Sequence, residues 1–273
     1  VLFRSTIETM MEANRLLHEA KRHHDVTITI KPISHQDLRF MTFSDASFAS
    51  HNKPNSYAGS ITVATHQDIS KNIECPISPL MWGSKKIQRV VTSTLSAETA
   101  SLASALDQLS WLRLYWKWLH DPKTEWHKPE EALCKIEPAI SVTTISQDSD
   151  LAVTDCKSLY DLITRTAPPS CSEFRVQLVA RSIKEILREG INLRWVHTGA
   201  QLADCLTKAM EARFLRETLS HGFYKLHDET ATLKERAKTR DRIQWLKQQS
   251  KQNNNQDMRE HQNQPHAEIT EDP

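Results

Sequence analysis

Two short segments, far apart in the chain, carry the same pattern: an alternating apolar run that ends in an aspartate. They are residues 41–45 (MTFSD) and residues 151–155 (LAVTD). Alternate side chains of a β-strand share a face, so each aspartate lies beside its apolar neighbours at the carboxyl end of its strand. If the two strands are parallel neighbours, Asp45 and Asp155 meet at the edge where α/β sheets bind ligands. The pattern therefore predicts an α/β fold with an acidic site at one sheet edge.

The spacing of apolar residues predicts the other elements. Helical spacing recurs over residues 6–24, 95–119, 157–164, 174–189 and 201–210, with Gly190 closing the fourth helix. Alternation predicts strands over residues 26–30, 38–45, 57–65, 81–87, 151–154 and 193–197, the second and third of these forming a hairpin. The hydroxyls of residues 92–94 suit the start of the long helix. Residues 123–150 contain prolines and no period, which predicts mostly loop.

A third carboxylate, Glu98, stands on the apolar stripe of the long helix, beside Leu95 and Leu102. A charged residue at an apolar position is either at a helix end outside the core or held there for a reason. Asp204 adds a fourth carboxylate at the start of the last expected helix. Four such groups suit a hard divalent ion such as Mg²⁺. Each also has a plainer explanation, as a turn former, a helix cap or a partner of a helix dipole.

Composition narrows the function classes. Lys and Arg number 35 against 34 Asp and Glu, a net charge of +1, so overall charge gives no argument for nucleic-acid binding. There is neither an apolar run of the ~18 residues that a membrane span needs nor a secretory signal pattern, so we expect an intracellular protein without membrane contact. The five cysteines form no C-x-x-C pair, which argues against a disulfide framework and a structural zinc site.

Several motifs resemble the ribonuclease H domain of copia-type retrotransposon polyproteins, over about residues 37–210. They are S-D-A-S at 44–47, G-S-K-K at 83–86, S-T-L-S-A-E at 93–98, T-D-C-K-S-L at 154–159 and W-V-H-T-G-A-Q-L-A-D-C-L-T-K at 195–208. The resemblance implies a ribonuclease H-like α/β fold, a mixed five-stranded sheet flanked by helices. It also implies a catalytic and metal-binding quartet of Asp45, Glu98, Asp155 and Asp204.

The same resemblance implies a domain organisation. Residues 1–36 are expected to be the end of the reverse transcriptase or its connection, and residues 37–224 the ribonuclease H-like domain. Residues 225–273 would be a charged helix followed by a disordered Gln- and Asn-rich tail. The basic part of that tail is either a solvated helix or a nucleic-acid contact. A start at Val1 agrees with a piece of a longer polyprotein.

The implied reaction is endonucleolytic hydrolysis of the RNA strand of an RNA/DNA hybrid during reverse transcription. Two Mg²⁺ ions, replaceable by Mn²⁺, would act together, with Asp45 between them, Glu98 and Asp155 on one side and Asp204 on the other. Expected partners are the hybrid and the reverse transcriptase of the same polyprotein, in the cytoplasm (a virus-like particle) or the nucleus. Polar residues near the carboxylates are expected to contact nucleic acid: Ser47, Lys85, Lys86, Gln88, Thr94 and Ser96.

Two positions depart from the family, and some roles stay open. Cys156 stands where the family usually has Asn, and His197 lies nearer the last aspartate than the helping histidine of cellular enzymes. His197 either assists catalysis or has a structural role at a strand end. Lys85 and Lys86 either contact phosphates or form a solvated strand edge.

Two rival functions remain. One is a catalytically inactive retroelement remnant that at most binds nucleic acid. The other is an integrase or junction resolvase of the same fold, because a fold does not fix its substrate.

Overall fold

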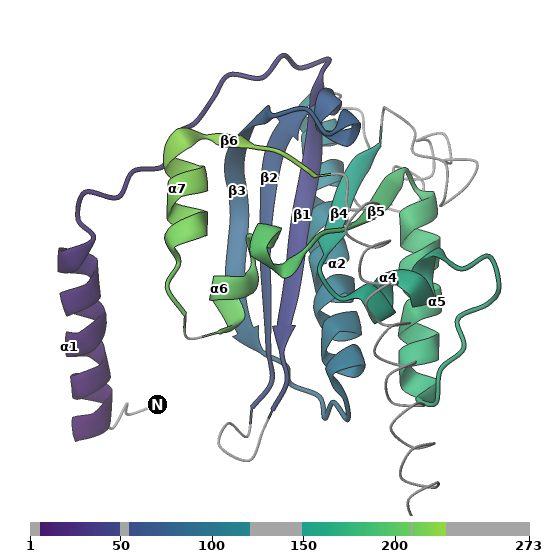
Figure 1. The fold of residues 1–273 in the computed structure, drawn as a ribbon, viewed down its shortest axis with the longest axis horizontal. Coiled ribbons are helices and arrows are strands. Elements are labelled where there is room, and N and C mark those ends of the chain that lie inside the picture. The colour runs from purple at the N-terminus through teal and green to yellow at the C-terminus, as the bar shows by residue number, and fades with distance from the viewer. Residues whose placement is uncertain (1–5, 50–54, 121–148, 209, 228–273) are drawn as a thin grey trace, which may run out of the picture. The chain divides into compact units, whose positions relative to one another are not determined.

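The computed structural model describes residues 6–49, 55–120, 149–208 and 210–227. Within these residues one mixed sheet runs through the protein in the order β5-β4-β1-β2-β3-β6 (Figure 1). The strands are β1 (Leu38–Ser47), β2 (Tyr57–His66), β3 (Cys75–Lys86), β4 (Asp150–Thr154), β5 (Ile191–Trp195) and β6 (Phe223–Tyr224). β1, β2 and β3 are antiparallel, whereas β4 is parallel to both β1 and β5. A mixed sheet of this kind is what the motif resemblance implies.

Five of the six strands predicted from alternation are present in the sheet, and the sheet has one more strand that was not predicted. The two-residue strand β6 pairs antiparallel with the start of β3, through Cys75↔Tyr224 and Pro76↔Phe223. A pairing this short leaves no alternation to detect in the sequence. The mixed sheet flanked by helices is thus confirmed, with six strands among the described residues instead of five.

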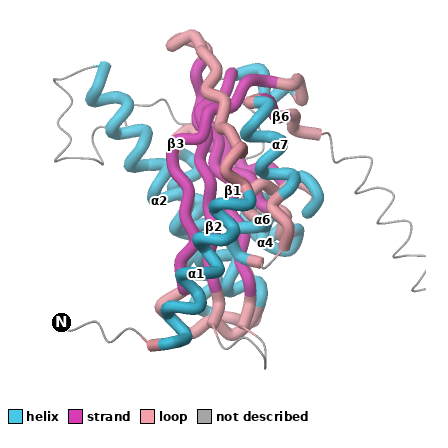
Figure 2. Tube along the Cα trace, turned by 90° about the vertical axis from the view of Figure 1, so that its left-hand side faces the viewer, coloured by secondary structure: helices cyan, strands magenta, loops and turns pink. Residues whose placement is uncertain are grey.

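Helices cover both faces of the sheet (Figure 2). One face carries α2 (Thr94–His120), α4 (Lys157–Thr164) and α5 (Phe174–Arg188), whose apolar sides form one core cluster with Phe40 and Ala152. The other face carries α6 (Asp204–Thr207) and α7 (Arg213–His221), where Leu202 and Ala203 pack with Phe43 and Val153 in a second cluster. The central strands are apolar on both faces because both faces are buried.

Several predicted elements are confirmed. Helix α4 has the predicted bounds, α2 is one residue longer at each end, and α5 ends at Arg188, with Gly190 at φ 89° just beyond it. The hydroxyl run before α2 acts as expected, because the Ser93 hydroxyl accepts the Ser96 N–H at 3.1 Å. Strands β1 and β2 form the predicted antiparallel pair.

Other expectations were wrong. Residues 26–30 form no strand: the Thr29 N–H donates to the Leu219 carbonyl at 2.9 Å, so this segment lies along the end of α7 instead of pairing in the sheet. Strand β3 begins at Cys75, six residues earlier than expected, and β5 both begins and ends two residues earlier than predicted. The helix expected over residues 201–210 is the single turn of α6, because Lys208 adopts extended backbone angles (φ −119°, ψ 142°).

The remaining elements lie outside the two layers or at their ends. They are α1 (Ile7–Arg22), η1 (Gln67–Lys71) and η2 (Thr198–Ala200). Helix α1 starts as the sequence predicts, with Thr6 accepting the Thr9 N–H, but none of its residues is buried. The loop expected over 123–150 falls almost entirely outside the described residues, as do the helix and tail expected after Tyr224. None of the helices in the described part of the chain is both long and apolar enough to cross a bilayer.

Candidate active site

Asp45 and Asp155 meet at the end of the parallel pair β1–β4, as their matching patterns predict. The register runs from Met41↔Leu151 to Ser44↔Thr154, so Asp45 and Asp155 directly follow the last paired residues of the two neighbouring strands. The Asp45 residue is 1% exposed, and Asp155 is partly buried. The Trp195 indole N–H donates to the Asp155 carbonyl at 2.8 Å and so fixes the chain just after β4.

Asp204 completes a tight group of carboxylates from the other side of the site. It is the first residue of α6 and is buried. One carboxylate oxygen from each of Asp45, Asp155 and Asp204 lies within 4.8 Å of the others. Two strand ends and a one-turn helix therefore bring three carboxylates close enough to share one metal ion.

Glu98, at the second turn of α2, does not belong to this group of three, but it lies near enough for the charges of Asp45 and Asp155 to act on it. It is 6% exposed, it accepts the Ala46 N–H, and its Oε2 has no hydrogen-bond partner. Burial, followed by the charges of Asp45 and Asp155, raises its pKa to about 9, against the lowering effects of Lys208 and the Ala46 N–H. A buried carboxylate oxygen without a partner is costly, so this oxygen is suited to a ligand that the protein itself does not supply.

Asp45 is held by contacts from three directions. The Thr207 hydroxyl donates to its Oδ2, and the Lys208 ammonium lies 3.4 Å from its Oδ1. Its backbone carbonyl accepts the Ser101 hydroxyl of α2 at 2.7 Å. Burial raises the pKa of Asp45 to about 6; the Thr207 hydrogen bond and Lys208 oppose this rise, and the charges of Asp155 and Asp204 add to it.

The close approach of α6 to the sheet depends on Gly59, which pairs with Asp45 across β1 and β2. A Cβ atom at Gly59 would come 2.9 Å from the Leu206 Cβ and 2.7 Å from the Thr207 Cγ2. Any larger residue would push the single turn of α6 outward, and Asp204 with it. No local pattern indicates this contact, because Gly59 and its partners are far apart in the chain.

Thr207 and Lys208 are site residues that the sequence analysis did not assign a role. Both lie in the L-T-K end of the last motif, three and four residues after Asp204, so a helical turn places them on the side of that carboxylate. Burial lowers the pKa of Lys208, but its hydrogen bond to Asp204 and the charges of Asp45, Asp204 and Asp155 outweigh this effect and raise it. The spacing of Asp204 and Lys208, four residues apart, is the sequence signal that could have predicted this contact.

The structure gives His197 and Cys156 local contacts. His197 is exposed and its Nδ1 accepts the Gly199 N–H at 3.0 Å, so it caps the short η2 turn. Cys156 precedes α4, its Sγ lies 3.3 Å from the Ser158 hydroxyl, and burial raises the pKa of its thiol. The proton-transfer role considered for His197 stays a prediction.

The residues expected to contact nucleic acid lie around the carboxylate end of the sheet. Ser47 ends β1, and in the same row across the sheet Tyr57 pairs with Lys86 of β3. Thr94 and Ser96 belong to the first turn of α2, which also leads to Glu98. Lys85, Lys86 and Gln88 are exposed. Their contact with nucleic acid remains a prediction.

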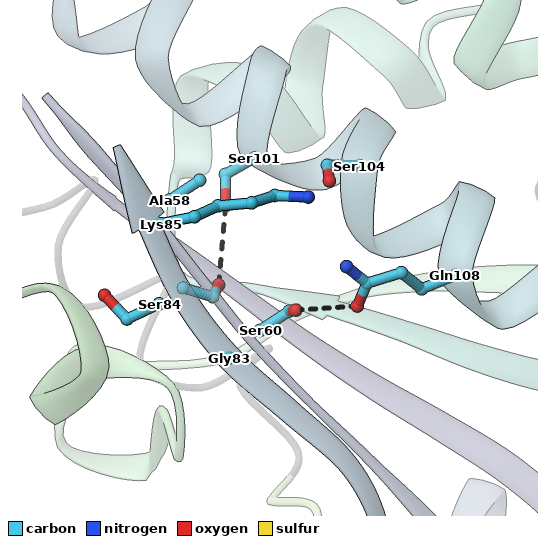
Figure 3. A pocket seen from close by; sticks show the side chains of 9 residues that line it. Ala58, Ser60, Gly83, Ser84, Lys85, Ser101, Ser104 and Gln108 are labelled. Atoms are coloured by element: carbon cyan, nitrogen blue, oxygen red, sulfur yellow. Dashed lines mark hydrogen bonds between the residues drawn. The ribbon is translucent and has the colours of Figure 1, made fainter. Parts of the chain in front are cut away.

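Lys85 also lines a pocket between α2 and strands β2 and β3 (Figure 3). The Ser60 hydroxyl donates to Gln108 at 3.1 Å across this pocket, and Ser101, which holds the Asp45 carbonyl, forms part of its wall. The pocket therefore shares structural contacts with the acidic site, although it lies on the α2 side of the sheet.

The donor set of the acidic site fits a divalent cation. All four side chains offer hard oxygen ligands, which Mg²⁺ and Mn²⁺ prefer. Burial first, and then the charges of neighbouring carboxylates, raise the pKa values of Glu98 and Asp45, and Oε2 of Glu98 has no partner, so the ionised forms of these two groups are poorly compensated by the protein. A divalent ion would supply that missing charge.

No protein-family model matches the chain, and no curated protein matches its sequence. Solved structures do show likeness. Ribonuclease H1 of the archaeon Halobacterium salinarum is 15% identical (TM-score 0.36), over 62% of this chain and 93% of that one. LC11 ribonuclease H1, from a compost metagenome and in complex with an RNA/DNA hybrid, is 14% identical (TM-score 0.37), over 62% and 93%.

A foamy viral protease–reverse transcriptase in complex with double-stranded DNA is also similar. It is 15% identical, with a TM-score of 0.34, over 65% of this chain and 96% of that one. At such identities and TM-scores these likenesses carry no functional inference.

Proposed function

We propose that this protein is a metal-dependent ribonuclease H that hydrolyses the RNA strand of RNA/DNA hybrids. The observation that carries the proposal is the acidic site: oxygens of Asp45, Asp155 and Asp204 lie within 4.8 Å of one another. Glu98, whose Oε2 has no partner, is near enough for the charges of Asp45 and Asp155 to act on it. Such a concentration of buried carboxylates is unfavourable without a cation. It is favourable in an enzyme that holds divalent ions against a phosphodiester.

Asp45, Glu98, Asp155 and Asp204 would hold the ions, two Mg²⁺ with Mn²⁺ as a substitute. When bound, such ions lower the pKa of an attacking water and stabilise charge on the leaving oxygen. The protein's own part is to fix the carboxylates. Thr207 holds the Asp45 side chain, Ser101 and Trp195 hold the backbone at Asp45 and Asp155, and the N–H of Ala46 orients Glu98.

The choice of an RNA/DNA hybrid rests on the motif resemblance and on the polar rim of the site. Hydroxyls of Ser47, Thr94 and Ser96 lie on the elements that carry Asp45 and Glu98, where they could contact the 2′-hydroxyls of an RNA strand. Lys85 and Lys86 would bind phosphates of the partner strand. Residues 37–224 would form the catalytic domain.

The wider assignment follows from the resemblance. The chain would be part of a copia-type retrotransposon polyprotein, with residues 1–36 leading from its reverse transcriptase. The reverse transcriptase would supply the hybrid, inside the cell in a virus-like particle or the nucleus.

The test is a comparison of substrates with the full chain. An RNA/DNA hybrid and a DNA duplex of the same sequence, each labelled on either strand, are incubated with Mg²⁺, with Mn²⁺ and with EDTA. The proposal predicts cutting of the RNA strand alone, in either metal and not in EDTA, leaving 3′-hydroxyl and 5′-phosphate ends.

Two outcomes would contradict it. Equal cutting of the DNA duplex would assign the site to a DNA transferase or resolvase. No cutting by a folded chain that binds the hybrid would favour an inactive remnant.

A further inference from the structure

Lys208 occupies an unusual place for a lysine, inside the acidic site. Its ammonium donates a hydrogen bond to Oδ1 of Asp204 and lies 3.4 Å from Oδ1 of Asp45. The backbone of α6 places it there, because Lys208 is the C-cap of α6 and its N–H donates to the Asp204 carbonyl at 3.2 Å. A positive charge thus lies between two of the carboxylates that could hold a metal.

The two oxygens of Asp45 have different partners. Thr207 contacts Oδ2, and Lys208 is the partner of Oδ1. A hydroxyl and a metal ion can share one carboxylate, because the hydroxyl contributes no charge. An ammonium and a divalent ion at the same oxygen repel each other. A cation bound by Asp45 and Asp204 together therefore competes with Lys208 and not with Thr207.

The exposure of the three side chains shows which partner can move. The Asp45 and Asp204 side chains are 1% and 11% exposed and lie between packed elements, whereas the Lys208 side chain is 42% exposed. Lysine has a flexible four-carbon stem and a strongly hydrated ammonium. Lys208 can therefore leave into solvent without disturbing the carboxylates.

We propose that Lys208 is an internal counter-ion, an inference that rests on the proposed function. Its ammonium occupies the place of a divalent ion between Asp45 and Asp204 and is displaced when metal binds. It is a positioning residue: it keeps the two carboxylates together in the metal-free protein. The consequence is that it weakens metal binding, because an ion must first break the ion pairs. Metal binding and the Lys208 contacts are thus coupled with opposite sign.

The test uses the full chain with Lys208→Met, which keeps a similar length and removes the charge. Mn²⁺ and Mg²⁺ binding is measured by calorimetry, and thermal unfolding is followed in EDTA. We expect the variant to melt at a lower temperature than wild type in EDTA but to bind Mn²⁺ about tenfold more tightly, within the usual range of coupling between two competing ligands. Lys208→Arg, which keeps the charge, should bind Mn²⁺ more weakly than Lys208→Met.

Lys71→Met is the matched control. Lys71 has a similar exposure, 45%, and an ion pair with Asp68 three residues away, outside the acidic site. It should leave Mn²⁺ affinity unchanged. If Lys208→Met proves unfolded in EDTA, Lys208→Gln replaces it with the same expectation, because the amide can still donate to Asp204.

The outcomes separate this inference from the proposed function. Unchanged or weaker Mn²⁺ binding by the uncharged variants, with normal binding by wild type, overturns the role of Lys208 alone. Absence of Mn²⁺ binding by wild type and all variants overturns the metal site itself, and with it the proposed ribonuclease.

Discussion

Gly59 lies directly beneath Thr207, so that a Cβ atom at Gly59 would come 2.7 Å from the Thr207 Cγ2. This contact joins β2 to the turn that carries Asp204, Thr207 and Lys208. The geometry of the acidic site therefore depends on a residue that has no chemical function of its own.

We predict that Gly59→Ala displaces α6 and weakens the metal site. Overpacking of this kind costs about 1–3 kcal/mol of unfolding free energy, and the stabilisation that Mg²⁺ gives to wild type should be largely lost. Gly83→Ala is the control, because nothing lies within 4 Å of a Cβ there. Urea unfolding with and without Mg²⁺ measures both; equal behaviour of the two variants would contradict the packing role of Gly59.

Thr207 should orient Asp45 for metal binding through its hydroxyl. Removing a group that hydrogen-bonds to a metal ligand usually lowers metal affinity about 10–100-fold, so Thr207→Val should bind Mn²⁺ that much more weakly. Thr207→Ser keeps the donor and should stay near wild type. Calorimetric titration with Mn²⁺ distinguishes them, and equal affinities for the two variants would mean that the hydroxyl only fills space.

The metal-free protein should lose stability as the pH rises. Burial raises the pKa of Glu98 from 4.5 to about 9 and that of Asp45 from 3.8 to about 6. The folded state then binds more protons than the unfolded state, so this contribution is complete below pH ~4 and disappears as the pH rises through the folded values.

The difference between wild type and Glu98→Gln isolates the Glu98 part of this effect. In EDTA, wild type should lose unfolding free energy relative to the variant between about pH 4.5 and 9. With saturating Mg²⁺ the loss should shrink, because the ion replaces the proton. Urea unfolding at pH 5, 6.5 and 8 measures it, and a difference that stays constant with pH would show that Glu98 is not protonated in the fold.

Asp150 should matter for stability and not for chemistry. Its Oδ2 pairs with Arg113 Nε at 2.8 Å, both side chains are nearly buried, and its Oδ1 accepts the Phe40 N–H at 2.7 Å. Asp150→Asn leaves a buried guanidinium uncompensated, which should cost about 3–5 kcal/mol. Glu185→Gln removes an exposed pair with Arg188 and should cost less than about 1 kcal/mol. Similar losses in the two variants, measured by urea unfolding, would refute the structural role.

The sequence predicted what depends on local pattern. Strand and helix periods placed β1, β2, β4, α2 and α4, and the matching MTFSD and LAVTD segments brought Asp45 beside Asp155. Glu98 could be found because a carboxylate interrupts an apolar stripe. Each of these patterns is contained in a short stretch of sequence.

The errors come from contacts between distant segments. Residues 26–30 alternate like a strand, but Thr29 finds its backbone partner at Leu219 and not in the sheet. Helix α7 was not predicted, although Leu215 and Leu219 stand four residues apart and pack on the second core cluster, because nine residues are too few to show a clear period. Gly59 is explained only by Leu206 and Thr207, which the fold brings over it. Lys208 could have been read from its spacing to Asp204, yet only the structure places it against Asp45.

The most direct measurement is single-turnover cleavage of a labelled RNA/DNA hybrid in Mg²⁺ by the full wild-type chain, by Asp155→Asn and by Asp25→Asn. Asp25 is exposed and lies outside the acidic site, so it controls for the substitution itself. We expect RNA-strand cutting by wild type and Asp25→Asn, and a loss of at least about a hundredfold with Asp155→Asn. Undiminished cutting by a folded Asp155→Asn protein would contradict the assignment of the acidic site as the catalytic centre.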